Sequence, residues 1–299
     1  MLAGPCKEPL FKKCCILGLG LMGGSLGLAL GEHKVVRERW GYDLDAAAML
    51  QAKKRGAVDR TAELPRALAD AELVILAMPV RQILLMLGRI ASCLPKGAIV
   101  TDMGSTKEKV VQTMEAVLPA GVTGIGGHPM AGSEKAGIAA ADPLLLKNAV
   151  YILTPARQTK AAALKKMRQT VRAIGARPLV MEAAQHDRMA AMVSHLPQLL
   201  AVALVNSLGD SGQTQKRLLR LAGNGFRDTT RIAMGEPGMW YDIFQTNRLF
   251  IKESLQIFMK ELDLLYNCLE REDEKELKAR LSRAGSTRRL LTALSRSEG

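Results

Sequence analysis

The chain of 299 residues lacks several features that would place it in a specialised class of protein. No uninterrupted apolar run reaches the roughly 18 residues that span a bilayer, which predicts a protein without a membrane partner. The few apolar residues at the N-terminus are interrupted by prolines and charges, a pattern unlike a secretory signal. Aromatic residues make up only 4% of the chain, and no segment interleaves them with basic residues as in nucleic-acid-binding segments.

The five cysteines, an odd number, show no CxxC spacing, so neither a disulfide framework nor a metal site is expected. Reduced thiols of this kind are typical of a cytoplasmic protein. The net charge of +13 could attract polyanions, but the basic residues are scattered along the chain. We therefore expect a basic surface around a site for small anionic ligands, and no nucleic-acid partner.

Two periodicities divide the chain into an α/β part and an all-helical part. Up to residue 181, short apolar strands alternate with helical stretches, which predicts a mostly parallel, doubly wound Rossmann-type sheet with helices on both faces. From residue 182 onward, apolar residues recur at helical spacings of three and four. The predicted domains are residues 1–181, which bind a dinucleotide, and residues 182–299, an all-helical substrate-binding and dimerisation domain.

The longest helical pattern runs from Trp240 to Leu269 and covers about 30 residues, or roughly 45 Å of helix. A compact domain of this size does not need so long a helix internally. We therefore predict a homodimer joined through the helical half. In the preceding helical pattern, Pro197 follows His195 closely, and it predicts either a bend that exposes polar groups to a ligand or a simple helix break.

A G-x-G-x-x-G motif follows the first strand and opens a helical run. The first glycine permits a tight turn, the second lets the backbone approach a pyrophosphate, and the third allows close packing of helix on strand. The motif predicts a dinucleotide site. Its residues are Gly18, Gly20 and Gly23, with Leu21 and Met22 between them.

Further cofactor residues are expected where later strands end. Asp43 ends the second strand, where a carboxylate can bond the ribose 2′-hydroxyl and would repel a 2′-phosphate. This favours NAD, with NADP as an alternative cofactor and Asp45 as an alternative to Asp43. Met78 and Pro79 end the third clear strand and are candidate walls of the nicotinamide site.

The same edge of the sheet should hold a histidine and a serine. His128 is expected in a glycine-braced loop directly after a strand at residues 122–126, and Ser105 follows the strand before it. A histidine beside a redox cofactor can exchange a proton. The alternative is a histidine that only caps a turn.

These motifs occur in an order that resembles the prephenate and arogenate dehydrogenases of tyrosine biosynthesis. Short further matches are His186-Asp187 and Ser194-His195-Leu196-Pro197. The order and spacing hold across nearly the whole chain. The four main matching stretches are Gly18 to Gly23, Asp102 to Lys107, Gly127 to Glu134, and Gly225 to Arg231 with Trp240 following.

The resemblance implies NAD(P)-dependent oxidative decarboxylation of prephenate, L-arogenate or both, giving 4-hydroxyphenylpyruvate, L-tyrosine or both. It implies that His128 accepts the proton of the ring hydroxyl and that Ser105 orients that hydroxyl. Arg231 would bind a substrate carboxylate through its planar fork, and it would form an ionic gate with Glu134 and Asp228. Ser133, His195 and Trp240 would complete the pocket. For His195 the alternative is a core histidine, for Arg231 a surface ion pair, and for His186 a helix cap.

Two positions depart from the pattern of prephenate-specific members. Gln198 stands where these often carry a second histidine, and Asn224 where they often carry glycine. A histidine can present positive charge to the substrate side chain, whereas glutamine offers a neutral amide. We therefore predict that both residues lie in the substrate site and that arogenate is also accepted, as in a cyclohexadienyl dehydrogenase.

Two other classes share part of the pattern. A β-hydroxyacid dehydrogenase also begins with a glycine-rich loop and ends in helices, but it calls for a catalytic lysine in the helical half in an arrangement that this sequence lacks. A non-catalytic NAD-binding sensor would need the glycine motif without convergent His128, Ser105 and Arg231.

Overall fold

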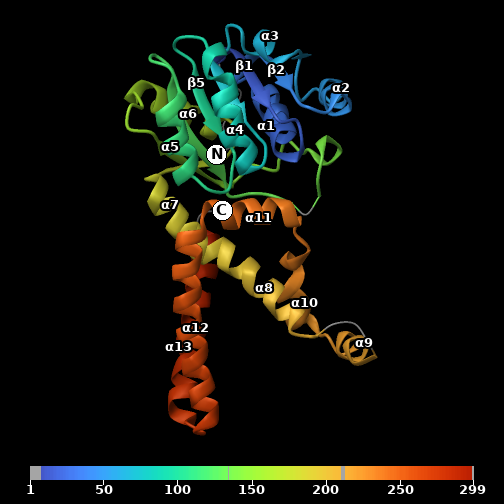
Figure 1. Cartoon of the computed structure of the whole chain (residues 1–299), viewed down its shortest axis with the longest axis vertical. Coiled ribbons are helices and arrows are strands. Elements are labelled where there is room, and N and C mark those ends of the chain that lie inside the picture. The colour runs from blue at the N-terminus through green and yellow to red at the C-terminus, as the bar shows by residue number, and fades with distance from the viewer. Residues whose placement is uncertain (1–7, 134, 210–212, 298–299) are drawn as a thin grey trace. The chain divides into compact units, whose positions relative to one another are not determined.

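The computed structural model describes residues 8–133, 135–209 and 213–297. The chain forms two compact units, residues 1–248 and 249–299. The first unit contains an eight-stranded sheet with the order β3-β2-β1-β4-β5-β6-β7-β8. Figure 1 labels β1, β2 and β5 of this sheet. Neighbouring strands are parallel except β6 and β7, which are antiparallel. The strands are β1 (Phe11–Leu17), β2 (Val36–Tyr42), β3 (Arg60–Thr61), β4 (Leu73–Leu76), β5 (Ile99–Asp102), β6 (Thr123–Pro129), β7 (Val150–Pro155) and β8 (Arg177–Val180).

The helices of the first unit fall into two groups, those that connect strands and those that follow the last strand. Short 3-10 turns lie at Ala91–Cys93, Ile138–Ala140 and Arg231–Met234. The connecting helices are α1 (Leu21–Glu32), α2 (Ala46–Lys54), α3 (Leu64–Leu68), α4 (Val80–Ile90), α5 (Glu108–Val117) and α6 (Ala161–Ala173). The later helices are α7 (Ala183–Ala190), α8 (Leu196–Asn206), α9 (Gln213–Arg220), α10 (Asn224–Thr230) and α11 (Pro237–Thr246).

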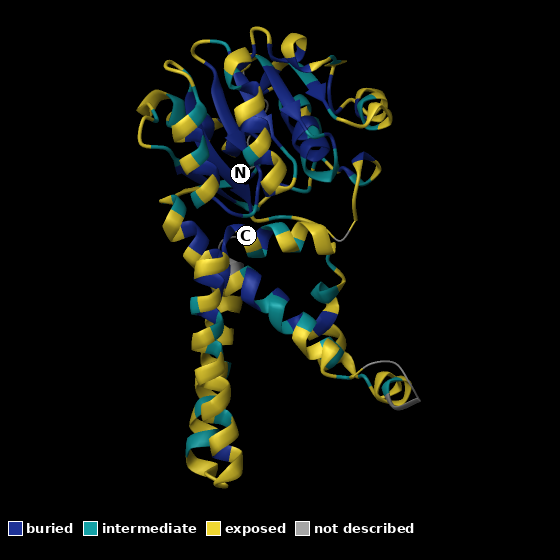
Figure 2. Ribbon diagram, in the orientation of Figure 1, coloured by how far each residue is buried: buried dark blue, intermediate teal, exposed yellow. Residues whose placement is uncertain are grey.

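Side chains of the central strands alternate between two hydrophobic cores, one on each face of the sheet. On β1, Cys14 and Ile16 join the core that α1 and α6 cover, whereas Cys15 and Leu17 join the core that α4 and α5 cover. Figure 2 shows the strands buried between helices whose outer faces are exposed. Burial on both faces explains why these strands are continuously apolar. The predicted doubly wound α/β domain followed by helices is confirmed.

Strand β6 continues further than the sequence indicates. The prediction of a strand at residues 122–126 with His128 in a loop after it is wrong, because β6 runs to Pro129 and His128 pairs with Ile152 of β7. The extra residues are held by an antiparallel neighbour that is distant in sequence. His128 therefore sits on a hydrogen-bonded strand, which fixes its backbone more firmly than a loop would.

Helices α7 and α8 form one continuous helical segment, Ala183–Asn206, with a π-helical turn at Ala191–His195. The widened turn lies directly before Pro197, which has no N–H to donate and crowds the preceding turn. Pro197 thus distorts the helix without ending it. The segment is long and apolar enough to cross a membrane by length and composition alone. We interpret it as a helix of a folded domain, because His186, Asp187 and His195 are buried and hydrogen-bonded there.

The prediction of one helix from Trp240 to Leu269 is wrong. α11 ends at Thr246, and α12 (Arg248–Glu270) begins two residues later. Asn247 between them leaves the helical conformation, with φ −117° and ψ 26°. Its side chain is buried and bonds to Asp187 and His195, which are distant in sequence, so tertiary contacts hold the chain in this break.

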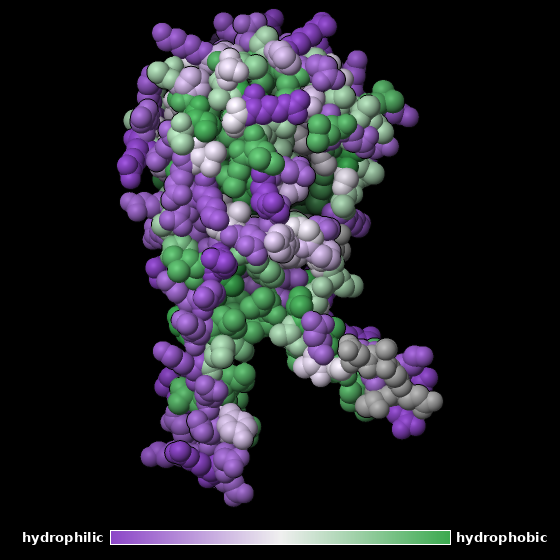
Figure 3. Space-filling view, viewed as in Figure 1, coloured by the Kyte–Doolittle hydropathy of each residue, from purple (hydrophilic) through white to green (hydrophobic). Residues whose placement is uncertain are grey.

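The second unit is a pair of helices, α12 and α13 (Glu274–Ser297). Arg280 of α13 pairs with Glu261 of α12 at 2.9 Å and with Glu276 of its own helix at 2.9 Å. Apolar side chains remain exposed on both helices, and Figure 3 shows them among hydrophilic ones. These exposed apolar residues include Ile257, Met259, Leu262, Leu264, Tyr266, Leu269 and Leu281.

Candidate active site

The glycine turn between β1 and α1 is shaped by close backbone contacts. Gly18 has a φ of +93°, and a Cβ added there would lie 2.3 Å from the Ala77 carbonyl oxygen. A Cβ at Gly23 would lie 1.9 Å from the Gly18 oxygen. A Cβ at Gly20 would meet nothing within 4 Å, so the backbone there is open toward a ligand at the N-terminus of α1. This is the cradle that a pyrophosphate requires.

The two acidic residues after β2 have different roles. The Asp43 carboxylate accepts hydrogen bonds from Leu19 N at 2.7 Å and Asp45 N at 3.0 Å, and it lines a cavity beside the glycine turn. Asp45 instead caps α2 by accepting from Ala47 N at 2.8 Å, and it does not line that cavity. The geometry therefore favours Asp43 as the group that faces a ribose.

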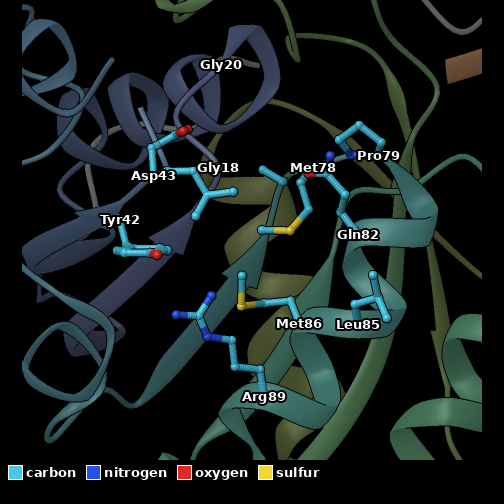
Figure 4. Close-up of a pocket in the computed structure, with 12 residues that line it drawn as sticks. Gly18, Gly20, Tyr42, Asp43, Met78, Pro79, Gln82, Leu85, Met86 and Arg89 are labelled. Carbon is cyan, nitrogen blue, oxygen red and sulfur yellow. The ribbon is translucent and has the colours of Figure 1, made fainter. Parts of the chain in front are cut away.

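The cavity beside Asp43 has a volume of about 400 Å³. Figure 4 shows Asp43, Gly18 and Gly20 on one side of it and residues of α4 on the other. Its mixture of apolar walls and a carboxylate suits an adenosine. Sequence reasoning missed Tyr42 at the end of β2 and four lining residues of α4. For the α4 residues, the amphipathic pattern of the helix was the available signal: Gln82, Leu85, Met86 and Arg89.

A second cavity of about 760 Å³ adjoins the first, since Gly20, Ala77, Met78 and Pro79 line both. Ser105 and His128 lie on it, as predicted from the ends of their strands. The cavity also has charged and apolar walls that sequence reasoning missed. Predicted residues on its wall include Leu21, Met22, Ser133, His195 and Trp240, and the missed ones include Met130, Lys135, Glu236 and Met239.

His128 is the first member of a buried hydrogen-bond chain. Its Nδ1 lies 2.8 Å from Nε2 of His186, whose own Nδ1 lies 2.7 Å from Oδ1 of Asp187. The Asp187 carboxylate also accepts main-chain hydrogen bonds from Lys107 N at 2.7 Å and Glu108 N at 2.9 Å. His186 is thus no helix cap, since α7 begins after Glu182.

The hydrogen bonds from His128 through His186 to Asp187 determine which ring nitrogen of His128 is left as an acceptor. Because Asp187 accepts, His186 donates from Nδ1 and, when neutral, presents a bare Nε2. His128 then donates from Nδ1, and its own Nε2 is left with a lone pair. Burial lowers the pKa of His128 well below its usual range, and His186 and Lys107 lower it further. The ring is therefore neutral at neutral pH, with the lone pair of Nε2 free to accept a hydrogen bond from a ligand.

A fully buried ion pair fixes the backbone next to His128. Lys107 Nζ contacts Oδ2 of Asp102, and neither side chain is exposed. Gly127 N donates to Asp102 Oδ1 at 3.0 Å, and Lys107 Nζ donates to the Gly127 carbonyl at 2.8 Å. Both main-chain groups of Gly127 are therefore held by one ion pair. A Cβ there would lie 2.4 Å from the main-chain carbonyl oxygen of Asp102, so only glycine allows this approach.

The far end of the cavity is built around Trp240. Its ring packs edge-on against His195, with centroids 6.3 Å apart. A Cβ at Gly235 would lie 2.2 Å from Trp240 Nε1, so the indole packs directly on the glycine. Burial lowers the pKa of His195 to about 4, although Asp187 opposes this shift. His195 is therefore a second neutral imidazole in the same cavity.

The structure does not bring every predicted residue into the cavity. Gln198 is buried but is not part of the cavity wall. Asn224, Asp228 and Arg231 are exposed on α10 and the turn after it, and they do not line either cavity formed by the described residues. Glu134 lies outside the described residues, so the ionic gate with Arg231 stays a prediction.

Comparison with known proteins agrees with this geometry. The sequence-family model of the prephenate dehydrogenase nucleotide-binding domain matches residues 26–180. The family model of the prephenate dehydrogenase dimerization domain matches residues 182–283. The chain is 37% identical over 264 residues to prephenate dehydrogenase of Bacillus subtilis, covering 88% of this chain and 71% of that protein. It is 31% identical over 274 residues to cyclohexadienyl dehydrogenase of Zymomonas mobilis, covering 88% and 90%.

A solved structure extends the likeness to three dimensions. Prephenate dehydrogenase from Aquifex aeolicus, in complex with hydroxyphenyl propionate and NAD+, superposes with a TM-score of 0.87 at 32% identity, covering 94% of this chain and 98% of that one. The chain is accordingly an NAD-dependent oxidoreductase that carries out an oxidative decarboxylation in tyrosine biosynthesis. The glycine turn, the Asp43 carboxylate beside it and the cavity lined by His128 agree with that activity, and the chain belongs to the prephenate dehydrogenase family.

Proposed function

We propose that His128 is the proton acceptor of this reaction and that Ser105 orients the hydroxyl that loses the proton. The observation that carries the proposal is the hydrogen-bond chain from His128 through His186 to Asp187. It occupies Nδ1 of His128 and leaves Nε2 as the ring nitrogen that can serve a ligand in the cavity. Ser105 lines the same cavity.

The proton follows a closed path in this proposal. The glycine turn and Asp43 would hold NAD, which would supply the acceptor for the hydride on the ring carbon that bears the hydroxyl. His128 Nε2 takes the hydroxyl proton as charge develops on that oxygen. After CO₂ has left and the ring is aromatic, His128 returns the proton to the same oxygen. Asp187 stabilises the transient imidazolium through His186, as the carboxylate of a catalytic triad does.

We further propose that the pocket accepts both prephenate and L-arogenate. The two substrates differ in the side chain, which is a keto acid in one and an amino acid in the other. The charged groups among the described residues of the cavity wall have both signs, Lys135 and Glu236, while His195 is neutral. A wall of this kind does not reject an ammonium group as a cationic histidine would.

Steady-state kinetics on the purified chain test the proposed substrates. NADH formation is measured with prephenate and with L-arogenate supplied separately, at saturating NAD. We expect turnover of both, with kcat/KM values within about 100-fold of each other, since charged hydrogen bonds contribute about 1.5–3 kcal/mol each. Turnover of prephenate alone would contradict dual specificity, and turnover of neither would contradict the proposed function.

We also propose that the chain works as a cytoplasmic homodimer, with residues 1–181 as the cofactor domain and residues 182–299 as the substrate and dimerisation domain. Three observations support this arrangement: the match of residues 182–283 to a dimerization domain, the exposed apolar residues of α12 and α13, and the free thiols of the described cysteines. Light scattering on the full chain should give the mass of two chains. The mass of one chain across micromolar concentrations would contradict the dimer.

A further inference from the structure

Asn247 interrupts the predicted long helix and contacts His195, a residue of the wall of the active-site cavity. Its side chain is buried, with 2% of its surface exposed. The amide Nδ2 donates to the main-chain carbonyl of Asp187 at 2.8 Å and lies 3.0 Å from Nδ1 of His195. The residue therefore connects the helix break to a histidine of the cavity wall.

The orientation of this amide follows from its partners. A main-chain carbonyl can only accept a hydrogen bond, so the side of Asn247 that faces Asp187 O is the NH₂ group. The same NH₂ group has a second hydrogen, and this one points to Nδ1 of His195. Nδ1 of His195 must consequently be the unprotonated ring nitrogen. A flipped amide would place two oxygens against each other at Asp187.

The other ring nitrogen of His195 then carries the proton. His195 Nε2 is buried and has no hydrogen-bond partner among the described residues, yet the side chain lines the cavity. An N–H group buried without a partner is costly, and an acceptor on a ligand would remove that cost. A neutral imidazole that is held as a donor can thus select an oxygen of the ligand.

We propose that Asn247 is a positioning residue that holds His195 as a neutral Nε2–H donor to an acceptor oxygen of the substrate. The inference rests on the proposed function for the identity of the substrate, but not for the state of the ring. It gives the two cavity histidines opposite tautomers. His128 carries its proton on Nδ1 and accepts at Nε2, whereas His195 carries its proton on Nε2 and accepts at Nδ1 from Asn247.

Nitrogen NMR tests the ring states directly, because the chain has only four histidines. The full chain is labelled with ¹⁵N-histidine, and two-bond ¹H–¹⁵N correlations at pH 7 distinguish the two neutral tautomers and the cation. Single His→Gln variants assign the signals. We expect His195 in the Nε2–H form and His128 in the Nδ1–H form. A cationic His195, or an Nδ1–H form of it, would overturn the inference whether or not the chain turns over prephenate.

Substitutions of Asn247 then test the role of the amide. Asn247→Asp replaces the donor by an acceptor, and it should convert His195 to the Nδ1–H form or the cation. Asn247→Ala removes the donor. Both variants should raise KM for the ring substrate by about tenfold, while the NAD affinity and the His128 signals stay unchanged. His195 signals that are unchanged in both folded variants would overturn the positioning role.

The adjacent Thr246 offers a matched control on the same helix break. Its hydroxyl bonds to Asp242 O and Thr106 and does not reach His195. Thr246→Ser keeps those bonds and should leave the His195 signals and KM unchanged. Equal changes in Thr246→Ser and Asn247→Ala would show that any disturbance of the break alters the ring, which would also overturn the specific role of the amide.

Discussion

Substituting one partner of the ion pair between Lys107 and Asp102 should lower the free energy of unfolding strongly. Replacing Lys107 by Met removes the cation but leaves the Asp102 carboxylate fully buried, and the remaining donors to it among the described residues are Gly104 N and Gly127 N. The Gly127 carbonyl also loses its donor. Removing one partner of a buried pair costs about 3–5 kcal/mol, because the remaining charge is left uncompensated. Burial lowers the pKa of Lys107, and Asp102 opposes that shift. The charge on each partner is therefore stabilised by the other.

We therefore expect Lys107→Met to lower the free energy of unfolding by about 3–5 kcal/mol, a large share of the stability of a typical domain. Since Gly127 precedes His128, kcat should fall as well in the fraction that stays folded. Urea unfolding followed by circular dichroism measures the stability, and NADH formation measures kcat.

Lys166→Met, in helix α6 against the same sheet, provides the matched control. Lys166 is 3.9 Å from Glu72 in a partly exposed pair, and its ammonium lies over the Phe11 ring. Such pairs contribute about 1 kcal/mol or less, so this variant should stay close to the wild type. If Lys107→Met cost no more than Lys166→Met, the claim that the pair fixes Gly127 and His128 would be refuted.

Three further predictions concern the cofactor, the pocket and the pH dependence. Asp43→Ala should weaken NAD binding by about 10- to 100-fold and reduce discrimination against NADP, whereas Asp45→Ala should cost about 1 kcal/mol of stability without changing cofactor preference; calorimetric titration with both nucleotides checks this. Gly235→Ala should displace the Trp240 indole and raise KM for the ring substrate, while NAD affinity is unchanged; an unaltered KM would contradict the packing. The pKa of His195 is lowered to about 4 in the folded chain, so as the pH falls below about 6.5 the unfolded chain takes up this proton first. The free energy of unfolding therefore keeps its full value above about pH 6.5 and declines below it. Between pH 7 and pH 5 the loss should be about 2 kcal/mol, and urea unfolding of His195→Gln should show a correspondingly weaker pH dependence.

The features that the sequence predicts well are local ones. The turn at Gly18 and the carboxylate at Asp43 depend on a few residues next to a strand, and their motif carries the geometry with it. The positions of Ser105 and His128 follow from a general rule about the ends of parallel strands. Local sequence is enough to place these elements.

The features that the sequence missed depend on contacts between distant residues. His128 belongs to a strand because β7 pairs with it, and its partner His186 is 58 residues away. The helix break at Asn247 depends on its bond to Asp187, 60 residues earlier. The spacing of apolar residues along the chain does not indicate hydrogen bonds between residues so far apart in sequence. The resemblance suggested a role for Arg231, but the folded chain leaves this residue exposed outside the cavity.

The central claim is that His128 accepts the hydroxyl proton, and His128→Asn tests it most directly. The kcat for NADH formation from prephenate is measured beside the NAD dissociation constant, in the wild type and in the variant. A general base contributes about 10²- to 10⁴-fold, so we predict a loss of kcat in that range with NAD binding retained. A variant that keeps kcat within tenfold of the wild type would contradict the claim.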